Sequence, residues 1–320
     1  MRLLSPIDRL RRALTDPTRR ERNVVLALVV YVLVWAAYGT MSKASQGLHP
    51  DMTEIVAWSR DLAWGYKHPP LAAAVAWLWF NIFPTAEWSY YLLAMLMPAI
   101  ALWIVWRLSA DYLGIEKRVF GLALLMFVPF FNFHALKFNV NTVLLPTWAA
   151  ATFWFLRSYE TRDAGWAVLA GLGAAACMLG KYWSIFLVAG LVIAALIDRR
   201  RAAYFRSAAP WITIGAGLAG IAPHLVWLFR NNFAPFAYAM EVHGDKPLGG
   251  AALSALTYLG GAAAYIAVPL LIVAALIILR SFPRKRESSA TASTLSALGP
   301  RFRGDERKRI VSTTISGTAT

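Results

Sequence analysis

The residues best suited to chemistry lie close together in one polar stretch of an otherwise apolar chain. Asp51 and Glu54 are three residues apart, and Lys67 and His68 follow after a segment rich in tryptophan. A carboxylate can act as a general base toward a hydroxyl group, and cationic side chains bind phosphate. We therefore expect Asp51 and Glu54 to be catalytic and Lys67 and His68 to bind an anionic group.

A short helix is expected to position the two acids. Pro50 and Asp51 are helix-start signals, so Asp51 could also serve only as a helix cap. Apolar side chains then recur at helical spacing at Ile55, Trp58 and Leu62. This pattern predicts an amphipathic helix that lies along a membrane surface and ends near Gly65. The two prolines that follow favour an extended backbone at Lys67 and His68, where Lys67 could alternatively be an interface anchor.

The composition places this polar stretch in a membrane protein. Of the 320 residues, 58% are hydrophobic and 15% are charged, which excludes a soluble domain and a disordered chain. A disulfide framework is excluded because Cys177 is the single cysteine. The net charge of +15 does not indicate nucleic-acid binding, because no basic segment is interleaved with stacking aromatic residues.

The apolar runs predict an all-α, polytopic membrane protein with about eight transmembrane helices. We expect them at 23–41, 89–107, 119–134, 140–158, 165–180, 182–197, 208–229 and 251–279. The stretch 70–83 is too short to span and is expected to form an interfacial helix. This layout places most of the 32 lysine and arginine residues on the cytoplasmic side, as the positive-inside rule requires.

Three regions follow from this layout. Residues 1–22 form a basic cytoplasmic N-terminus, and 23–280 form the transmembrane domain, whose first outer loop is 42–88. Residues 281–320 are expected to be a disordered basic cytoplasmic tail. Within it, 283–287 and 300–304 resemble the translation of a palindromic genomic repeat, which suggests a C-terminally truncated chain, although an ordinary basic tail remains the alternative.

Four motifs together resemble the GT-C membrane glycosyltransferases. They are Trp-Gly-Tyr-Lys-His-Pro-Pro-Leu at 64–71 with its upstream acids, Lys-Phe-Asn-Val-Asn-Thr at 137–142, Leu-Gly-Lys-Tyr at 179–182 and Pro-His-Leu-Val-Trp at 223–227. The resemblance covers about 23–250 and is to the branch that includes protein O-mannosyltransferases, lipid A aminoarabinose transferases and lipopolysaccharide sugar transferases. It implies sugar transfer from a polyprenyl-phosphate donor to a lipid, glycan or protein acceptor on the outer, periplasmic face of the bacterial inner membrane.

Two features depart from the resemblance. Many members have adjacent acids where this chain has Asp51 and Glu54, and many have a second acid where this chain has Asn139 and Asn141. We therefore expect no metal ion at the site and no cofactor. Lys181 and Arg230 map to the outer side, and we expect them to bind the donor phosphate together with the basic pair of the first outer loop.

Two other classes remain as alternatives. A transporter or flippase of lipid-linked sugars would place ionisable groups in mid-membrane, and the expected spans have none at their centres. An inactive, truncated remnant of the family would keep the same motifs. The first outer loop carries its complete set of polar residues, which favours the enzyme.

Overall fold

The structure, a computed structural model, describes residues 5–61, 64–65, 67–243 and 248–281. All regular elements in these ranges are helices, which confirms the all-α prediction. The chain divides into two units, Met1–Ile272 and Val273–Thr320, of which the second holds only the end of α13 (Leu248–Ser281) among described residues. The tail expected at 281–320 lies outside the described residues beyond Ser281.

Four helices are long and apolar enough to cross a membrane, which fits a polytopic membrane protein. They are α2 (Arg20–Lys43), α5 (Glu87–Leu108), α11 (Ala209–Arg230) and α13. Each coincides with an expected span. The helices α7 (Leu144–Thr161), α8 (Ala164–Gly180) and α9 (Ile185–Ile197) match further expected spans but are shorter, so the number eight remains a prediction.

The expected span at 119–134 differs from the structure. The helix α6 (Ile115–Met126) ends early, and a short 3₁₀ helix, η2 (Pro129–Phe131), follows it. Val128 is extended, as is usual for a residue before proline, and Pro129 has no N–H to continue the helical hydrogen bonds. The apolar composition of this segment therefore does not give one continuous transmembrane helix.

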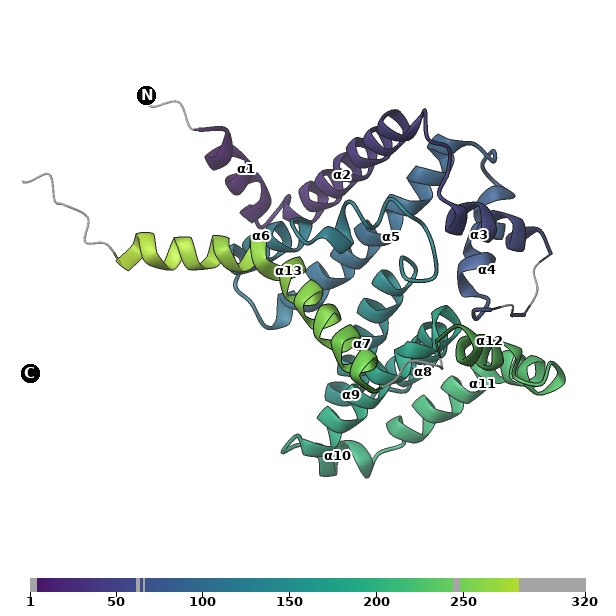
Figure 1. Ribbon diagram of the computed structural model, residues 1–320. Coiled ribbons are helices and arrows are strands. Elements are labelled where there is room, and N and C mark those ends of the chain that lie inside the picture. The colour runs from purple at the N-terminus through teal and green to yellow at the C-terminus, as the bar shows by residue number, and fades with distance from the viewer. Residues whose placement is uncertain (1–4, 62–63, 66, 244–247, 282–320) are drawn as a thin grey trace, which may run out of the picture. The chain divides into compact units, whose positions relative to one another are not determined.

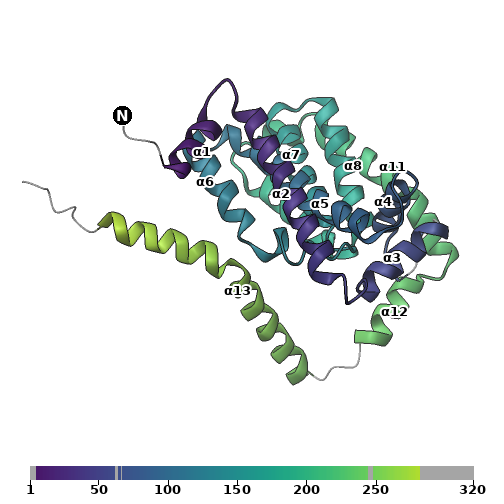
Figure 2. The same cartoon turned by 90° about the horizontal axis from the view of Figure 1, so that it is seen from above.

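The long helices pack side by side in the order α2, α5, α7, α8 and α11 (Figures 1 and 2). One apolar core joins α2 and α5 to the loop helices and to the segment 135–143. A smaller core lies around Tyr159 and Tyr204, where α7 meets α10 (Arg201–Phe205). The amphipathic helix α1 (Pro6–Thr15) precedes α2, and α12 (Ala234–His243) follows α11.

The segment between α2 and α5, which the sequence predicts to be the first outer loop, contains two short helices. The helix α3 (Pro50–Asp61) begins where the sequence predicts and buries Met52, Ile55 and Trp58. This apolar face packs in the main core, and α3 lies against α4 (Leu71–Phe80). With ten residues, α4 is too short to span a bilayer, in agreement with the prediction for 70–83. The loop is therefore a folded layer that holds the polar residues in place.

The ion pairs form two separate groups. Asp51–Lys137 and Glu54–Lys67 join residues that the sequence places on the outer side. Arg11–Glu116, Arg118–Glu21 and Arg157–Asp111 join residues that it places on the inner side. Among the described residues, no ion pair joins the two groups. The helices thus carry one set of charges at each end.

Candidate active site

Asp51 lies in the first turn of α3 and forms an ion pair with Lys137. Its Oδ2 atom is 2.7 Å from Lys137 Nζ, and its Oδ1 atom is 3.7 Å from His49 Nδ1. The hydrogen bond from Lys137 is the main reason why the pKa of Asp51 lies below its usual value, and the charges of Lys137 and Lys67 act in the same direction. Asp51 is therefore ionised at neutral pH, as a general base must be.

The structure also bears on the capping alternative for Asp51. The backbone N–H of Asp51 donates to His49 Nδ1 at 3.2 Å, and the backbone N–H groups of Met52 and Thr53 donate to the His49 carbonyl oxygen. This helix end therefore uses the imidazole and backbone of His49. The carboxylate of Asp51 is left directed at Lys137.

Lys137 is held in place by its buried neighbour. Phe138 is fully buried, and its carbonyl oxygen accepts a hydrogen bond from the Tyr90 hydroxyl at 2.5 Å. On the other side, Thr142 Oγ1 donates to the Lys137 carbonyl oxygen at 2.7 Å. The segment is thereby fixed against α5, so the ammonium group of Lys137 reaches α3. Lys137 is a site residue that sequence reasoning missed, although it opens one of the four recognised motifs.

Glu54 and Lys67 form the second ion pair of the site. Glu54 Oε1 is 2.8 Å from Lys67 Nζ, and both side chains are about two-thirds buried. Lys67 Nζ also lies over the ring of Tyr238 on α12, 6.0 Å from its centre. The structure thus brings Lys67, the first residue of the predicted basic pair, into contact with Glu54 near the start of α3.

His68 lies within electrostatic range of the other predicted groups. Burial is the main cause that lowers its pKa, and the charges of Lys181 and Lys67 lower it further, whereas those of Glu54 and Asp51 raise it. The charges of four other expected site residues therefore act on His68. Such a half-buried imidazole is neutral at pH 7 and can take up a proton when an anion arrives.

Lys181 lies in the break between α8 and the 3₁₀ helix η3 (Tyr182–Ser184). Its Nζ atom donates to Asn141 Oδ1 at 2.7 Å, and burial lowers its pKa. Asn141 stands where many GT-C proteins are expected to have an acid. Because its partner is an uncharged amide, the charge of Lys181 is not neutralised by a carboxylate.

Arg230 is the one predicted residue that the structure does not connect to the others. It is exposed at the C-terminus of α11 and forms no ion pair with a described residue. Its position at a helix C-terminus suits a cation on electrostatic grounds alone. Its role in phosphate binding remains a prediction.

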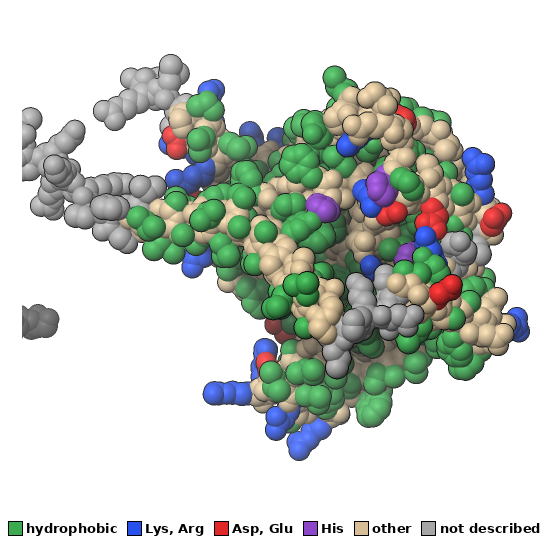
Figure 3. All heavy atoms as spheres, in the orientation of Figure 1, with side chains coloured by type: hydrophobic (Ala, Val, Ile, Leu, Met, Phe, Trp, Pro, Cys, Tyr) green, Lys and Arg blue, Asp and Glu red, His purple; other side chains and the backbone are tan. Residues whose placement is uncertain are grey.

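The charged side chains of the site gather on one face of the molecule. Figure 3 shows basic, acidic and histidine side chains together beside α3 and α12, on a surface that is otherwise largely apolar. The site contains three lysines (Lys67, Lys137 and Lys181) and two carboxylates. With His49 and His68 neutral, these three lysines and two carboxylates have a net charge of +1.

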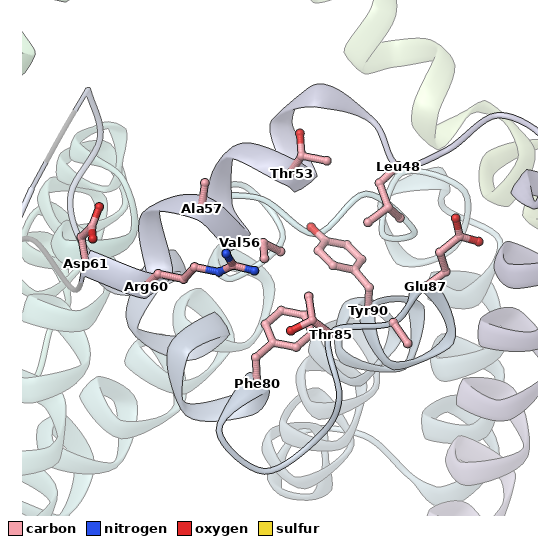
Figure 4. Close-up of a pocket in the computed structure, with 11 residues that line it drawn as sticks. Leu48, Thr53, Val56, Ala57, Arg60, Asp61, Phe80, Thr85, Glu87 and Tyr90 are labelled. Atoms are coloured by element: carbon pink, nitrogen blue, oxygen red, sulfur yellow. The ribbon is translucent and has the colours of Figure 1, made fainter.

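A cavity of about 530 Å³ lies on the other face of α3 (Figure 4). Val56, Phe80 and Tyr90 supply apolar walls, and Arg60 extends from α3 toward the two aromatic rings. Asp61 and Glu87 lie at its opposite ends. With one cation and two acids, this cavity has the opposite charge balance to the cluster around Lys67 and Lys181.

Among the described residues, no group of three histidine, cysteine, aspartate or glutamate side chains is arranged to hold a metal ion. The arrangement instead combines an ionised carboxylate with cations held at short range. These groups can accept a proton from a hydroxyl group and stabilise negative charge on a departing phosphate.

Two comparisons found known proteins that are similar to this chain, and no solved structure matches it. Residues 67–227 match the family model for dolichyl-phosphate-mannose-protein mannosyltransferases. The lipopolysaccharide core galacturonosyltransferase RgtB of Rhizobium johnstonii is 27% identical over 224 residues, which are 68% of this chain and 44% of that protein. The chain thus spans less than half the length of this relative.

The matched region contains Lys67, His68, Lys137 and Lys181, and ends at Trp227. The family match therefore covers the basic side of the site, whereas α3 with Asp51 and Glu54 lies before the matched region. The chain belongs to the dolichyl-phosphate-mannose-protein mannosyltransferase family, a family of GT-C type, and has helices long and apolar enough to cross a membrane.

Proposed function

We propose that this glycosyltransferase moves a sugar from a polyprenyl-phosphate donor to a lipid, glycan or protein acceptor at the outer face of the bacterial inner membrane. The observation that carries the proposal is that Asp51 pairs with Lys137 and Glu54 with Lys67, while the charges of Lys67 and Lys181 both act on His68. The excess of positive charge favours an anionic ligand such as the phosphate of a lipid-linked donor.

The proposed reaction exchanges one bond to the anomeric carbon for another. The acceptor oxygen forms a bond to this carbon while the bond between the carbon and the phosphate oxygen breaks. The acceptor proton passes to the carboxylate of Asp51. The donor phosphodiester, with one negative charge, leaves as a phosphomonoester with a second charge. No general acid is needed, because this leaving group departs without protonation.

The cations of the site would therefore act most strongly as the bond breaks. Negative charge grows on the phosphate during the reaction, so a fixed cation stabilises the transition state more than the bound donor. We assign this stabilising role to Lys67, His68 and Lys181, because the charges of both lysines act on His68. Lys137 has a different role, since it holds the Asp51 carboxylate in position.

The cavity behind α3 is the proposed place for the acceptor. Its apolar walls fit the C–H faces of a sugar ring, and Arg60, Glu87 and Thr85 offer partners for hydroxyl groups. Its two acids make it a poor place for the donor phosphate. Tyr90 forms part of its wall, and the Tyr90 hydroxyl group donates to the carbonyl oxygen of Phe138, the neighbour of the Lys137 that pairs with Asp51.

The substitution Asp51→Asn tests the catalytic part of the proposal. The amide keeps the size of the side chain, so donor binding should persist while the proton acceptor is lost. Loss of a general base typically costs about 10²–10⁴-fold in rate. Transfer from a labelled polyprenyl-phosphate sugar should fall by this factor in membranes that contain the full chain.

Asp163→Asn is the matched control, because Asp163 caps α8 at its other end and asparagine also caps helices. Wild-type transfer by the Asp51→Asn variant would rule out the proposed base. A wild-type chain that moves the donor lipid across the bilayer without transferring the sugar would indicate a flippase instead. Absence of both activities would favour an inactive member of the family.

A further inference from the structure

The buried residue His224 on α11 takes no part in the proposed chemistry, yet both of its ring nitrogens have partners. Its side chain is fully buried. Its Nδ1 atom is 2.6 Å from the carbonyl oxygen of Trp64, and its Nε2 atom is 2.9 Å from the hydroxyl oxygen of Tyr182. These contacts join α11 to two segments that are far apart in the sequence.

The partners determine how the hydrogen bonds run. A carbonyl oxygen can only accept, so Nδ1 of His224 carries the proton and donates it to Trp64. In the neutral ring, Nε2 then accepts the hydroxyl hydrogen of Tyr182. Both nitrogens are thereby occupied, and the ring has no lone pair left to serve as a base. The ring is also nearly parallel to the neighbouring rings of Tyr182 and Trp227, with interplanar angles of 26° and 11°.

Each partner of His224 is close in the sequence to a candidate phosphate ligand. Tyr182 directly follows Lys181, and its ring stacks on Phe236 of α12 at 4.8 Å. Trp64 lies three residues before Lys67 in the loop after α3. His224 therefore lies between the two segments that carry the cations of the site.

A glycine contact fixes the same loop a second time. An ideal Cβ atom on Gly65 would lie 2.4 Å from the ring of Trp227, so only glycine allows this approach without a shift. Trp227 and His224 are on the same face of α11, three residues apart. Trp64 and Gly65 are thus held against α11, the first by a hydrogen bond and the second by close packing.

We propose that His224 is a positioning residue that sets the separation between Lys67 and His68 on one segment and Lys181 on the other. It acts through the Trp64 carbonyl group and the Tyr182 hydroxyl group, and it does not touch the substrate. The inference rests on the proposed function, because it assigns both segments to one donor phosphate. A phosphate gains full stabilisation only when its cations are held at the right distance.

Two substitutions remove the hydrogen bonds of His224 to Trp64 and to Tyr182 one at a time. The amide nitrogen of Asn can occupy the position of Nδ1, so His224→Asn keeps the donor to Trp64 and loses Tyr182. The longer side chain in His224→Gln reaches the position of Nε2, so it keeps Tyr182 and loses Trp64. His224→Leu removes both partners, and Tyr182→Phe removes one hydroxyl group while it keeps the aromatic stack.

The first readout is kinetic. We expect His224→Leu to raise KM for a polyprenyl-phosphate sugar about tenfold or more, the loss typical of a buried hydrogen bond and its orphaned partner. Acceptor KM should change little. Tyr182→Phe and His224→Asn should resemble each other, because both lose the same hydrogen bond. If all four substitutions lowered the activity equally and left donor KM unchanged, His224 would only support the fold.

The second readout does not need activity. Amide hydrogen exchange in the full-length protein should accelerate in peptides that contain residues 64–71 in the Leu and Gln variants, but not in His224→Asn. Exchange in α2 and α5 should stay unchanged. His134→Asn is the control, because His134 is exposed and contacts Tyr265 instead.

The two readouts distinguish the failure of each proposal. If the wild-type chain transfers no sugar but exchange follows this pattern, the link is correct and the proposed function is wrong. If transfer depends on Asp51 but neither exchange nor donor KM responds to His224→Leu, the positioning role is wrong.

Discussion

Lys137 Nζ lies 2.7 Å from Asp51 Oδ2, and this ion pair joins the segment before α7 to the first turn of α3. The pair explains how a carboxylate beside several apolar side chains remains charged. It also gives the candidate base an orientation, because Lys137 is itself anchored by Phe138 in the core. The lysine is thus a neighbour that sets both the charge and the direction of Asp51.

Replacement of Lys137 by Met should move the acid limb of the pH profile to higher pH. Lys137 lowers the pKa of Asp51, whereas burial raises it. Without the lysine, the carboxylate becomes protonated at a higher pH, so activity is lost earlier on acidification. The measurement is kcat/KM against pH in membranes. Lys117→Met, which removes an exposed lysine from α6, should leave the profile in place.

His68 should make donor binding depend on pH. Burial and the charges of Lys181 and Lys67 lower its pKa in the free site, so the ring is neutral at pH 7. Protonation below that pKa adds a positive charge, and donor affinity should therefore increase as pH falls through it. A phosphodiester donor keeps its single charge in this range, so it does not contribute to the change. His68→Gln should abolish the dependence, and an unchanged dependence would exclude His68 from the phosphate site.

Arg60 should affect the acceptor and not the donor. It extends into the cavity behind α3 and forms no ion pair with a described residue. Arg60→Gln keeps hydrogen-bonding ability but removes the charge, so acceptor KM should rise about tenfold. Lys67→Gln should show the reverse pattern, with an increase in donor KM. If both substitutions changed the same constant, the two substrates would not lie on opposite faces of α3.

The local features of the site could be predicted from the sequence. Pro50 and Asp51 mark the start of α3, and its apolar spacing predicts the face that is buried. The sequence also places Glu54 and Lys67 in the same short loop, although it does not predict their ion pair. These are short-range properties, set by side chains that are near one another in the chain.

The remaining features depend on tertiary contacts that a single sequence does not specify. Lys137 could be placed on the outer side, but its contact with Asp51 requires α5 to hold Phe138. His224 belongs to the motif at 223–227, but its contact with Trp64 depends on how α11 meets the segment that contains Trp64. The apolar segment 119–134 resembles a span by composition, yet the break at Pro129 determines its structure.

The close approach of α8 and α11 connects the fold to the site. An ideal Cβ atom on Gly171 would lie 2.2 Å from the Thr213 carbonyl oxygen and 2.7 Å from the Gly217 nitrogen. Both are backbone atoms, so no side-chain rotation could relieve the clash. Thr213 Oγ1 also donates to the Ala167 carbonyl oxygen at 3.1 Å across the same interface. Such small residues allow two membrane helices to pack closely.

Gly171→Ala should therefore destabilise the protein by about 1–3 kcal/mol, the usual cost of overpacking. Gly190→Ala is the matched control, because nothing lies within 4 Å of its ideal Cβ position and alanine favours a helix by up to about 1 kcal/mol. Thermal unfolding in detergent should lower Tm for the first variant and not for the second. Since α8 precedes Lys181 and α11 carries His224, Gly171→Ala should also raise donor KM at temperatures where the protein remains folded. Equal Tm values for both variants would show that the two helices can separate without cost, and the shared positioning of the phosphate ligands would then not depend on this interface.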